Sequence, residues 1–264
     1  MLEWFYRTSV WITLPVFVGG FVAVSCLIVL ALRPVVHRLA SGGKEWDRAL
    51  AHVTGSFGVF FGILLALVAV SVYENFSDTR EAAIEEAGRV GALFRATAGL
   101  PDEVADPMRE LIDAYMHEVI QADFPQQQLG ILPDASDAQV DEFERLMHTV
   151  EAEPGDDQAQ FQQVLATFDD FVESRRARID ATSLALPPLF WLVIWVGAAV
   201  NAVLIAFIDV KNPRLHLLMA GLLALFIGLV MFVTADMDHP YAGTISVGPG
   251  AFERVLVQII DARG

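Results

Sequence analysis

Four long apolar runs dominate the pattern of hydrophobic and polar positions along the chain. They cover residues 10–32, 53–73, 187–208 and 217–235, and none contains Asp, Glu, Lys or Arg in its interior. Each run reaches the roughly 20 residues that a helix needs to cross the hydrocarbon core of a bilayer. In lipid, a chain can satisfy its backbone groups only as a helix or a closed barrel, so the runs predict four transmembrane helices.

Between the second and third runs, residues 74–186 change to a polar background with helical periodicity. Four apolar stripes predict four helices, and the first comprises Ile84, Ala87, Gly91, Phe94 and Ala98. Gly and Pro predict turns at 99–101, 124–125 and 154–155. Ser136 followed by Gln139 is typical of a capping box at the start of the third helix.

Charge is distributed as unevenly as hydropathy. Residues 74–186 hold 25 acidic residues, eight arginines and no lysine, a net charge of −17, whereas the whole chain carries −16. We therefore predict an all-α integral membrane protein with four transmembrane helices and an inserted acidic helical bundle between spans 2 and 3. The expected domains are a transmembrane hairpin (1–73), the acidic bundle (74–186), a second transmembrane hairpin (187–235) and a C-terminal tail (236–264). This acidity argues against binding to nucleic acid.

Basic residues predict an orientation in the membrane. The loop 33–52 carries four of them, and the loop 209–215 carries Lys211 and Arg214. By the positive-inside rule both loops are cytoplasmic, which leaves the two termini and the acidic bundle outside. The chain has one cysteine, Cys26, so an intrachain disulfide is excluded and a buried, inert thiol is expected.

The sequence contains no motif typical of a zinc hydrolase, a serine hydrolase or a phosphate-binding loop. We therefore expect no enzyme activity, no cofactor and no metal site. Asp236, Asp238 and His239 follow the fourth run and could hold a cation, although a hydrated membrane-exit segment explains them as well. Because the runs lack ionisable residues in their interiors, a pump or an ion-coupled transporter is not indicated.

Several segments resemble a bacterial bestrophin-like domain family. The second run with its continuation, GVFFGILLALVAVSVYENFSD at 58–78, is similar to the second span of that family. Residues 91–95, 99–101 and 111–115 resemble its bundle, and 238–243 and 246–249 resemble its tail. The resemblance implies a multi-pass protein of the bacterial plasma (inner) membrane related to the bestrophins, which are pentameric anion channels. It also implies a helical domain in the cytoplasm, opposite to the orientation that the basic loops predict.

Two classes of function remain open. The first is a passive oligomeric ion channel, in which several copies enclose a path and the acidic bundle forms a vestibule. Such a channel would be a homo-oligomer, and a pentamer if it follows the bestrophins. Its other partners would be the lipid bilayer and inorganic ions. The second is a non-conducting membrane sensor or scaffold whose bundle binds a ligand or a protein partner.

The second run supplies the candidate site residues. Bestrophins have a phenylalanine-lined neck on this span, so the resemblance implies pore-lining roles for Phe57 and Phe61. Leu65 lies on the same helical stripe and is a third pore-lining candidate. Small residues on a neighbouring stripe predict close helix packing against a similar stripe in the fourth run; they are Gly55, Gly58 and Gly62, and Ala220, Ala224 and Gly228. A charged ring at a pore mouth is a hypothesis for Glu74, Asp78 and Arg80, with an ordinary interfacial ion pair as the alternative.

Overall fold

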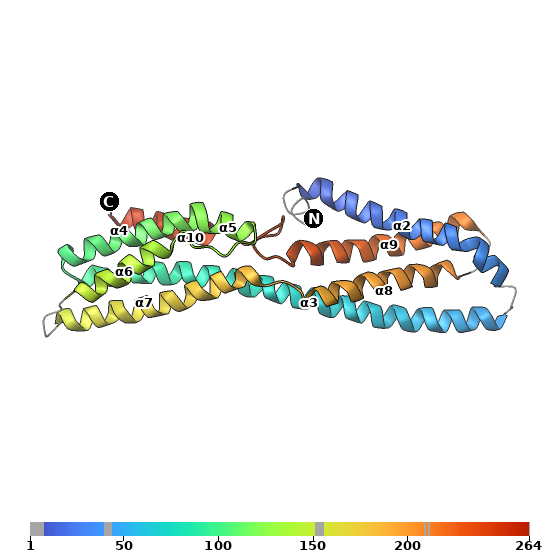
Figure 1. Ribbon diagram of the computed structural model, residues 1–264, viewed down its shortest axis with the longest axis horizontal. Coiled ribbons are helices and arrows are strands. Elements are labelled where there is room, and N and C mark those ends of the chain that lie inside the picture. The colour runs from blue at the N-terminus through green and yellow to red at the C-terminus, as the bar shows by residue number, and fades with distance from the viewer. Residues whose placement is uncertain (1–7, 40–43, 151–155, 209, 211, 264) are drawn as a thin grey trace. The chain divides into compact units, whose positions relative to one another are not determined.

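The computed structural model describes residues 8–39, 44–150, 156–208, 210 and 212–263 (Figure 1). Within these ranges the chain is helical and forms no strand, which confirms the all-α class. The helices are α2 (Val10–Leu39), α3 (Lys44–Ala96), α4 (Asp102–Glu118), α5 (Phe124–Gln128), α6 (Asp137–Thr149), α7 (Asp156–Asp180), α8 (Pro188–Ala206), α9 (Pro213–Met237) and α10 (Gly250–Arg263). Short 3-10 turns follow α3 and α7, and a π-helix, Val119–Asp123, joins α4 to α5.

The chain forms two compact units. Unit 1 comprises Met1–Glu74 and Ala185–Asp238, and unit 2 comprises Asn75–Leu184 and His239–Gly264. Because α3 is one helix of 53 residues, it contributes to both units.

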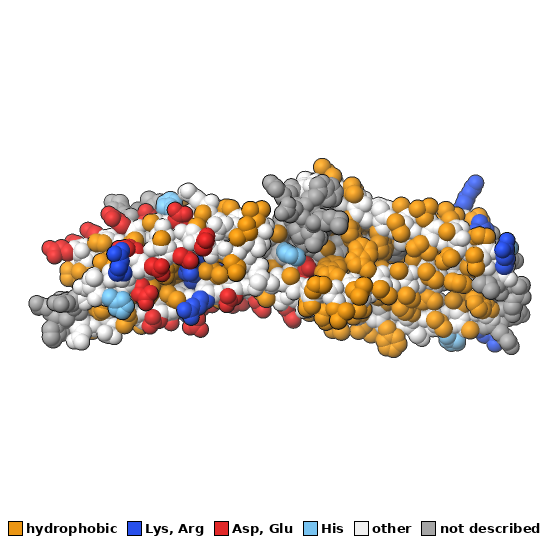
Figure 2. Space-filling model, viewed as in Figure 1, with side chains coloured by type: hydrophobic (Ala, Val, Ile, Leu, Met, Phe, Trp, Pro, Cys, Tyr) orange, Lys and Arg blue, Asp and Glu red, His pale blue; other side chains and the backbone are white. Residues whose placement is uncertain are grey.

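Unit 1 contains the apolar helices. In the described part of the chain, four helical segments are long and apolar enough to cross a membrane, namely Val10–Arg38, Arg48–Gly99, Pro188–Ala206 and Pro213–Met237. Each overlaps one of the four predicted runs, so the prediction of four candidate spans is confirmed. Figure 2 shows hydrophobic side chains over most of the visible surface of this unit and acidic side chains scattered over unit 2.

Small residues set the packing of α9 against α2. A Cβ atom added to Gly228 would lie 3.2 Å from Cδ1 of Phe21, and Ala220 is buried beside Val29 of α2. At the end of α9, the Asp238 carboxylate accepts hydrogen bonds from the Leu186 backbone N–H (2.7 Å) and from Trp191 Nε1 (2.9 Å). This carboxylate therefore joins the end of α9 to the beginning of α8.

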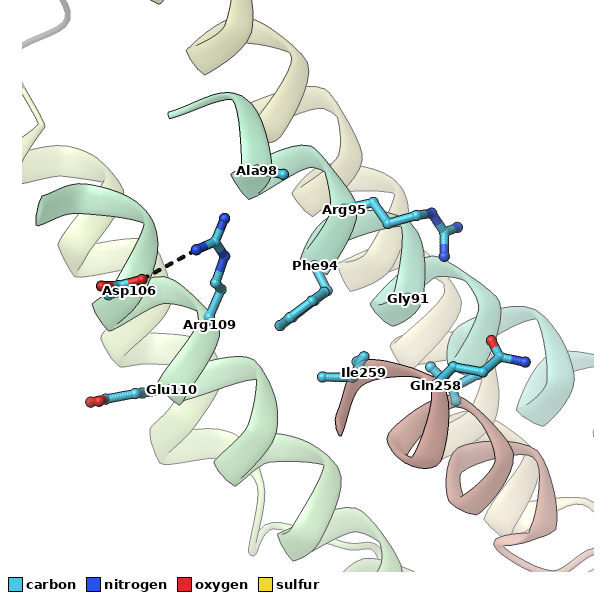
Figure 3. A pocket seen from close by; sticks show the side chains of 10 residues that line it. Gly91, Phe94, Arg95, Ala98, Asp106, Arg109, Glu110, Gln258 and Ile259 are labelled. Carbon is cyan, nitrogen blue, oxygen red and sulfur yellow. Dashed lines mark hydrogen bonds and ion pairs between the residues drawn. The ribbon is translucent and has the colours of Figure 1, made fainter. Parts of the chain in front are cut away.

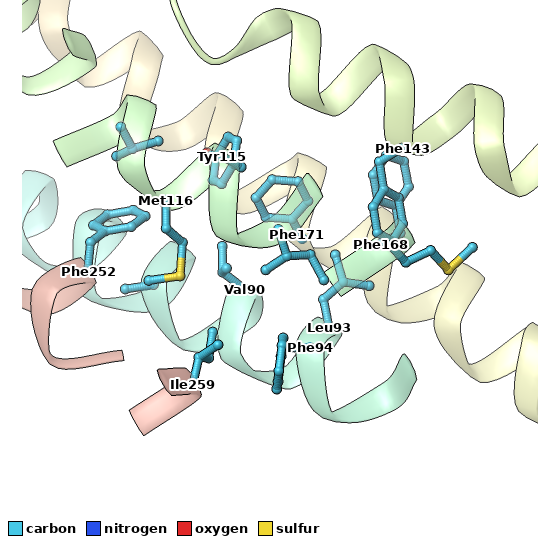
Figure 4. Packing of buried hydrophobic residues seen from close by; sticks show 14 of the residues in the cluster. Val90, Leu93, Phe94, Tyr115, Met116, Phe143, Phe168, Phe171, Phe252 and Ile259 are labelled. Carbon is cyan, nitrogen blue, oxygen red and sulfur yellow. The ribbon is translucent and has the colours of Figure 1, made fainter. Parts of the chain in front are cut away.

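Unit 2 is a helical bundle with an aromatic core. In Figure 1 the second half of α3 and helices α4, α6 and α7 run side by side, and α10 lies along α4. Phe143 of α6 stacks on Phe168 of α7 with ring centroids 5.0 Å apart, and Tyr115 of α4 meets Phe171 edge-on at the same distance (Figure 4). Phe252 of α10 is completely buried in this core. The segment 239–263 is therefore part of the packed unit.

Three local expectations are wrong. No turn occurs at 124–125, because the π-helix leads directly into α5 and Pro125 occupies its first turn, where a missing N–H costs little. Ser136 makes no capping hydrogen bond and donates instead to Asp123 Oδ2 at 2.7 Å. Ile84 and Ala98 of the first predicted stripe are exposed rather than buried. The turn expected at 154–155 lies outside the described residues.

Candidate functional site

Helix α3 has a packed face in unit 1. Phe61, Leu65, Val68 and Val72 are buried in one cluster with residues of α8 and α9. Their spacing of four, three and four residues keeps them on one side of a helix. A Cβ atom added to Gly197 of α8 would lie only 2.4 Å from Phe61 Cε2, so the Phe61 ring fills the space that a side chain at 197 would need.

The rest of the surface of this part of α3 is open. A Cβ atom added to Gly55, Gly58 or Gly62 would meet nothing within 4 Å, and Val59, Phe60 and Ile63 each expose more than half of their surface. An apolar surface of this kind on a membrane-spanning helix requires lipid or another protein chain to cover it.

The predicted pore-lining residues lie on or beside the packed face. Phe57 is half-buried and stacks on Phe61, with ring centroids 5.7 Å apart and an interplanar angle of 17°. Phe61 and Leu65 are buried within the chain.

The two predicted small-residue stripes do not meet within one chain. The stripe on α3, Gly55, Gly58 and Gly62, is open, whereas Ala220, Ala224 and Gly228 of α9 are buried, with Gly228 directly against α2. Glu74, Asp78 and Arg80 are exposed on α3, and the described part of the chain shows no ion pair among them.

A buried charged cluster in unit 2 was not predicted. Arg178 of α7 is completely inaccessible to solvent, and its guanidinium makes three hydrogen bonds. Nε donates to Glu86 Oε2 at 2.6 Å, Nη1 to Gln127 Oε1 at 2.7 Å, and Nη2 to Asp123 Oδ2 at 3.0 Å. Two buried carboxylates therefore share one arginine.

Further contacts surround this cluster. Tyr115 OH donates to Glu86 Oε1, and Arg175 Nη2 donates to Ser136 Oγ, which in turn donates to Asp123. Tyr241 OH donates to the Arg178 carbonyl oxygen at 2.9 Å. The rings of Phe124 and Phe252 lie 5.6 and 5.8 Å from the guanidinium carbon, within the range of a cation–π contact. The cluster thus ties α7 to α3, α4, the π-helix, α5 and the C-terminal segment.

The cluster shifts the pKa of three of its members. Burial raises the pKa of the Tyr115 phenol well above its ordinary value, and the charge of Glu86 raises it further. Burial also raises the pKa of Tyr241. For Arg178, burial opposes the charged form, but the Glu86 and Asp123 carboxylates outweigh it and the pKa of the guanidinium is raised. All three groups keep their protons at neutral pH.

Part of this cluster could have been predicted from the spacing of residues in the sequence. Glu86 lies among Ala83, Ala87 and Val90, the buried side of α3. Arg178 lies seven residues after Phe171 and therefore on the buried stripe of α7. A charged residue at an inward position implies a buried partner. The third charged residue of the cluster, Asp123, lies in the π-helix. The wider turn of a π-helix changes the spacing of residues along the helix, so the α-helical pattern does not locate Asp123.

Unit 2 also carries a groove of about 730 Å³ between α3, α4 and α10 (Figure 3). Phe94 and Ile259 supply apolar lining. Arg109 extends into the space between α3 and α4, where its Nη1 lies 3.2 Å from Asp106 Oδ1. The groove is large enough for a small molecule. Among the described residues, no three His, Cys, Asp or Glu side chains are close enough to bind a metal ion together.

Comparison with solved structures identifies the fold. A single-substitution variant of a bacterial bestrophin homologue from Klebsiella pneumoniae is similar, with a TM-score of 0.66 and 11% sequence identity over 94% of this chain and 99% of that one. A crystal structure described as a variant membrane protein has a TM-score of 0.64 and 10% identity, over 94% of this chain and 98% of that one. At such low identity the similarity establishes the fold alone.

Comparison with protein families agrees with these structures. No curated protein matches the chain. The family described as Bestrophin-like domain matches residues 19–252, which include three of the candidate spans and the first one from residue 19 onward. The chain therefore belongs to the Bestrophin-like domain family.

Proposed function

We propose that several copies of this protein form a passive ion channel in which α3 lines the conducting path. The observation that carries the proposal is the open apolar face of α3, around Gly58 and Ile63, in a member of the bestrophin-like family. A path without ionisable groups at membrane depth fits passive conduction rather than coupled transport.

Several copies are needed because four spans are too few to enclose a water-filled path. The glycines on the open face would allow α3 helices of neighbouring copies to approach closely around an axis. This supports a homo-oligomer, and a pentamer is the arrangement that kinship with the bestrophins suggests.

Two faces of α3 compete for the axial position. The predicted stripe of Phe57, Phe61 and Leu65 would form a hydrophobic constriction that gates by dewetting. The open face would instead present Val59, Ile63 and their neighbours. Support for the open face comes from burial, because Phe61 and Leu65 would have to leave α8 and α9 before they could face an axis.

The charge of unit 2 favours one sign of ion over the other. With 25 acidic residues against eight arginines in 74–186, a vestibule formed by this region would concentrate cations. We therefore propose that cations reach the path more readily than anions, in contrast to the anion channels that give the family its name.

Ion flux through reconstituted liposomes tests the proposal. In a Cys26→Ser background, Ile63→Cys on the open face should let a water-soluble thiol reagent block the flux. Leu222→Cys on α9, which is similarly exposed, is the matched control and should leave the flux unchanged. If Phe57→Ala with Phe61→Ala raises the flux and Ile63→Cys is never blocked, the stripe rather than the open face lines the path. Absence of flux from the unmodified protein would contradict conduction itself.

The groove between α3, α4 and α10 supports a second candidate function. A sensor or scaffold would bind its ligand there and would not need a continuous path. A dimer without flux would support this alternative, whereas a larger ring with flux would contradict it.

A further inference from the structure

The connection between α5 and α6, residues 129–136, exposes three large aliphatic side chains. Leu129, Ile131 and Leu132 are 61%, 53% and 59% exposed. The stretch 124–133 contains no charged residue, although the surrounding region 74–186 is strongly acidic. A cluster of exposed aliphatic side chains on an otherwise acidic bundle marks a surface that another apolar phase covers.

The shape of this connection is fixed by hydrogen bonds at its base. Gln126 Nε2 donates to Asp134 Oδ1 at 3.2 Å, and the Asp134 backbone N–H donates to Gln126 Oε1 at 3.1 Å. The Ile131 N–H donates to the Gln126 carbonyl at 3.0 Å, and Gly130 supplies the positive φ of 71° that the turn requires. The exposure of the three side chains is therefore built into the fold of the turn.

The turn lies at the end of unit 2 from which the chain continues into the candidate spans. Helices α3, α4–α5, α6 and α7 alternate in direction, so the α5–α6 turn shares an end with the beginning of the unit at Asn75 and its exit at Leu184. A hydrogen bond agrees with this arrangement: Gln127 Nε2, at the end of α5, donates to Thr182 Oγ1, close to the exit at Leu184, at 2.7 Å.

Chain length limits how far this end can be from the membrane. Pro188, where α8 begins, is only four positions after Leu184, which is at most about 14 Å of extended chain. The exposed aliphatic residues Leu184 and Ile245 also belong to segments next to the points where the chain passes between the units.

We propose that the Leu129–Leu132 turn inserts into the interfacial layer of the same bilayer that unit 1 crosses. Lipid covers the turn because the turn is apolar, uncharged and tethered within a few residues of a span. Burial of such side chains in the interfacial layer stabilises a membrane-bound segment. A second acidic bundle is a poorer partner, since like charges would surround the contact. The proposal depends on membrane spanning and not on conduction.

Quenching by brominated lipid tests the insertion. In the Cys26→Ser variant, these 264 residues contain no other cysteine. Ile131→Cys in this variant receives an environment-sensitive fluorophore, and the protein is placed in phosphatidylcholine liposomes. Lipids brominated near the headgroup end of the acyl chain should quench this label at least threefold more than a label on Val257→Cys.

Val257 is a matched control because it is 57% exposed, close to the 53% of Ile131. Its helix lies far from the end of unit 2 at which the turn is found. Val255 Cγ1 would be 3.1 Å from a Cβ atom on Gly91, and Gly91 is 16 residues, or about 24 Å, beyond Asn75 along α3. A Leu132→Cys label serves as a second probe and should behave like Ile131→Cys.

Equal quenching of the 131 and 257 labels, with both open to aqueous iodide, would overturn the proposal. So would a label at 131 that is shielded from both iodide and brominated lipid and becomes accessible on dissociation of the oligomer, because another copy would then cover the turn.

Discussion

Arg178 keeps a positive charge in the interior of unit 2 because Glu86 and Asp123 balance it. Removing only the arginine would leave two carboxylates buried without their donor, which typically costs about 3–5 kcal/mol. We expect Arg178→Met to lower the free energy of unfolding by this amount and to give a clearly lower Tm in detergent. Arg176→Met, an exposed arginine on the same helix, is the control and should leave the Tm unchanged. Equal Tm values for both variants would show that the cluster does not hold the bundle together.

Tyr115 gives the cluster a dependence on alkaline pH. Its raised pKa means that the folded state binds the phenolic proton more tightly than the unfolded state, whose phenol titrates near pH 10. The stability from this difference is complete below about pH 10 and is lost as the pH rises through the folded-state pKa. The Tm should therefore fall above about pH 10, and Tyr115→Phe should reduce this fall while Tyr73→Phe should not. Tyr241, whose pKa is also raised, accounts for the fall in Tm that remains in the Tyr115→Phe variant.

At the scale of helices, the contact between α3 and α8 depends on a glycine. Because a Cβ atom at 197 would lie 2.4 Å from the Phe61 ring, Gly197→Ala should force the two helices apart and cost about 1–3 kcal/mol. Gly58→Ala, at a helical position with open space, should be neutral or stabilising by up to about 1 kcal/mol. Thermal unfolding in detergent compares the two, and a Gly197→Ala protein as stable as Gly58→Ala would contradict the packing.

The helices themselves could be predicted from the sequence, but their partners could not. Apolar runs located the four candidate spans, because length and hydropathy alone decide whether a helix fits a bilayer. The small stripes on α3 and α9 were expected to meet, yet Gly228 faces Phe21 of α2. Periodicity shows which side of a helix is apolar and does not show which neighbour covers it. The π-helix before Pro125 escaped prediction for a related reason, since it changes the spacing on which the stripes depend.

At the scale of the whole molecule, the open face of α3 predicts an effect on assembly. Gly58→Leu would place a large side chain where neighbouring copies approach, so the oligomer should dissociate into smaller species. Gly20→Leu on α2, also in open space, is the control and should leave the oligomer intact. The mass of the detergent-solubilised particle measures both, and an unchanged mass for Gly58→Leu would mean that lipid rather than protein covers this face.

Orientation in the membrane is a second prediction at this scale. The basic loops indicate that 33–52 is cytoplasmic and that unit 2 lies outside. In the Cys26→Ser background, Ser41→Cys and Ala138→Cys should therefore react with a membrane-impermeant thiol reagent from opposite sides. Ala138 is exposed at the start of α6, whereas Ser136, two residues earlier, is fully buried and would make a poor probe. Labelling of Ala138→Cys from the cytoplasmic side would instead agree with a cytoplasmic helical domain.

The close approach of Phe61 and Gly197 also restricts how the sequence can change over evolution. An aromatic ring at 61 leaves no room for a side chain at 197, so a larger residue at 197 is accommodated best together with a smaller one at 61. Among relatives, we expect a larger residue at the position of Gly197 to coincide with a smaller one at the position of Phe61. The two positions, 136 residues apart in the chain, should therefore be inherited as a pair.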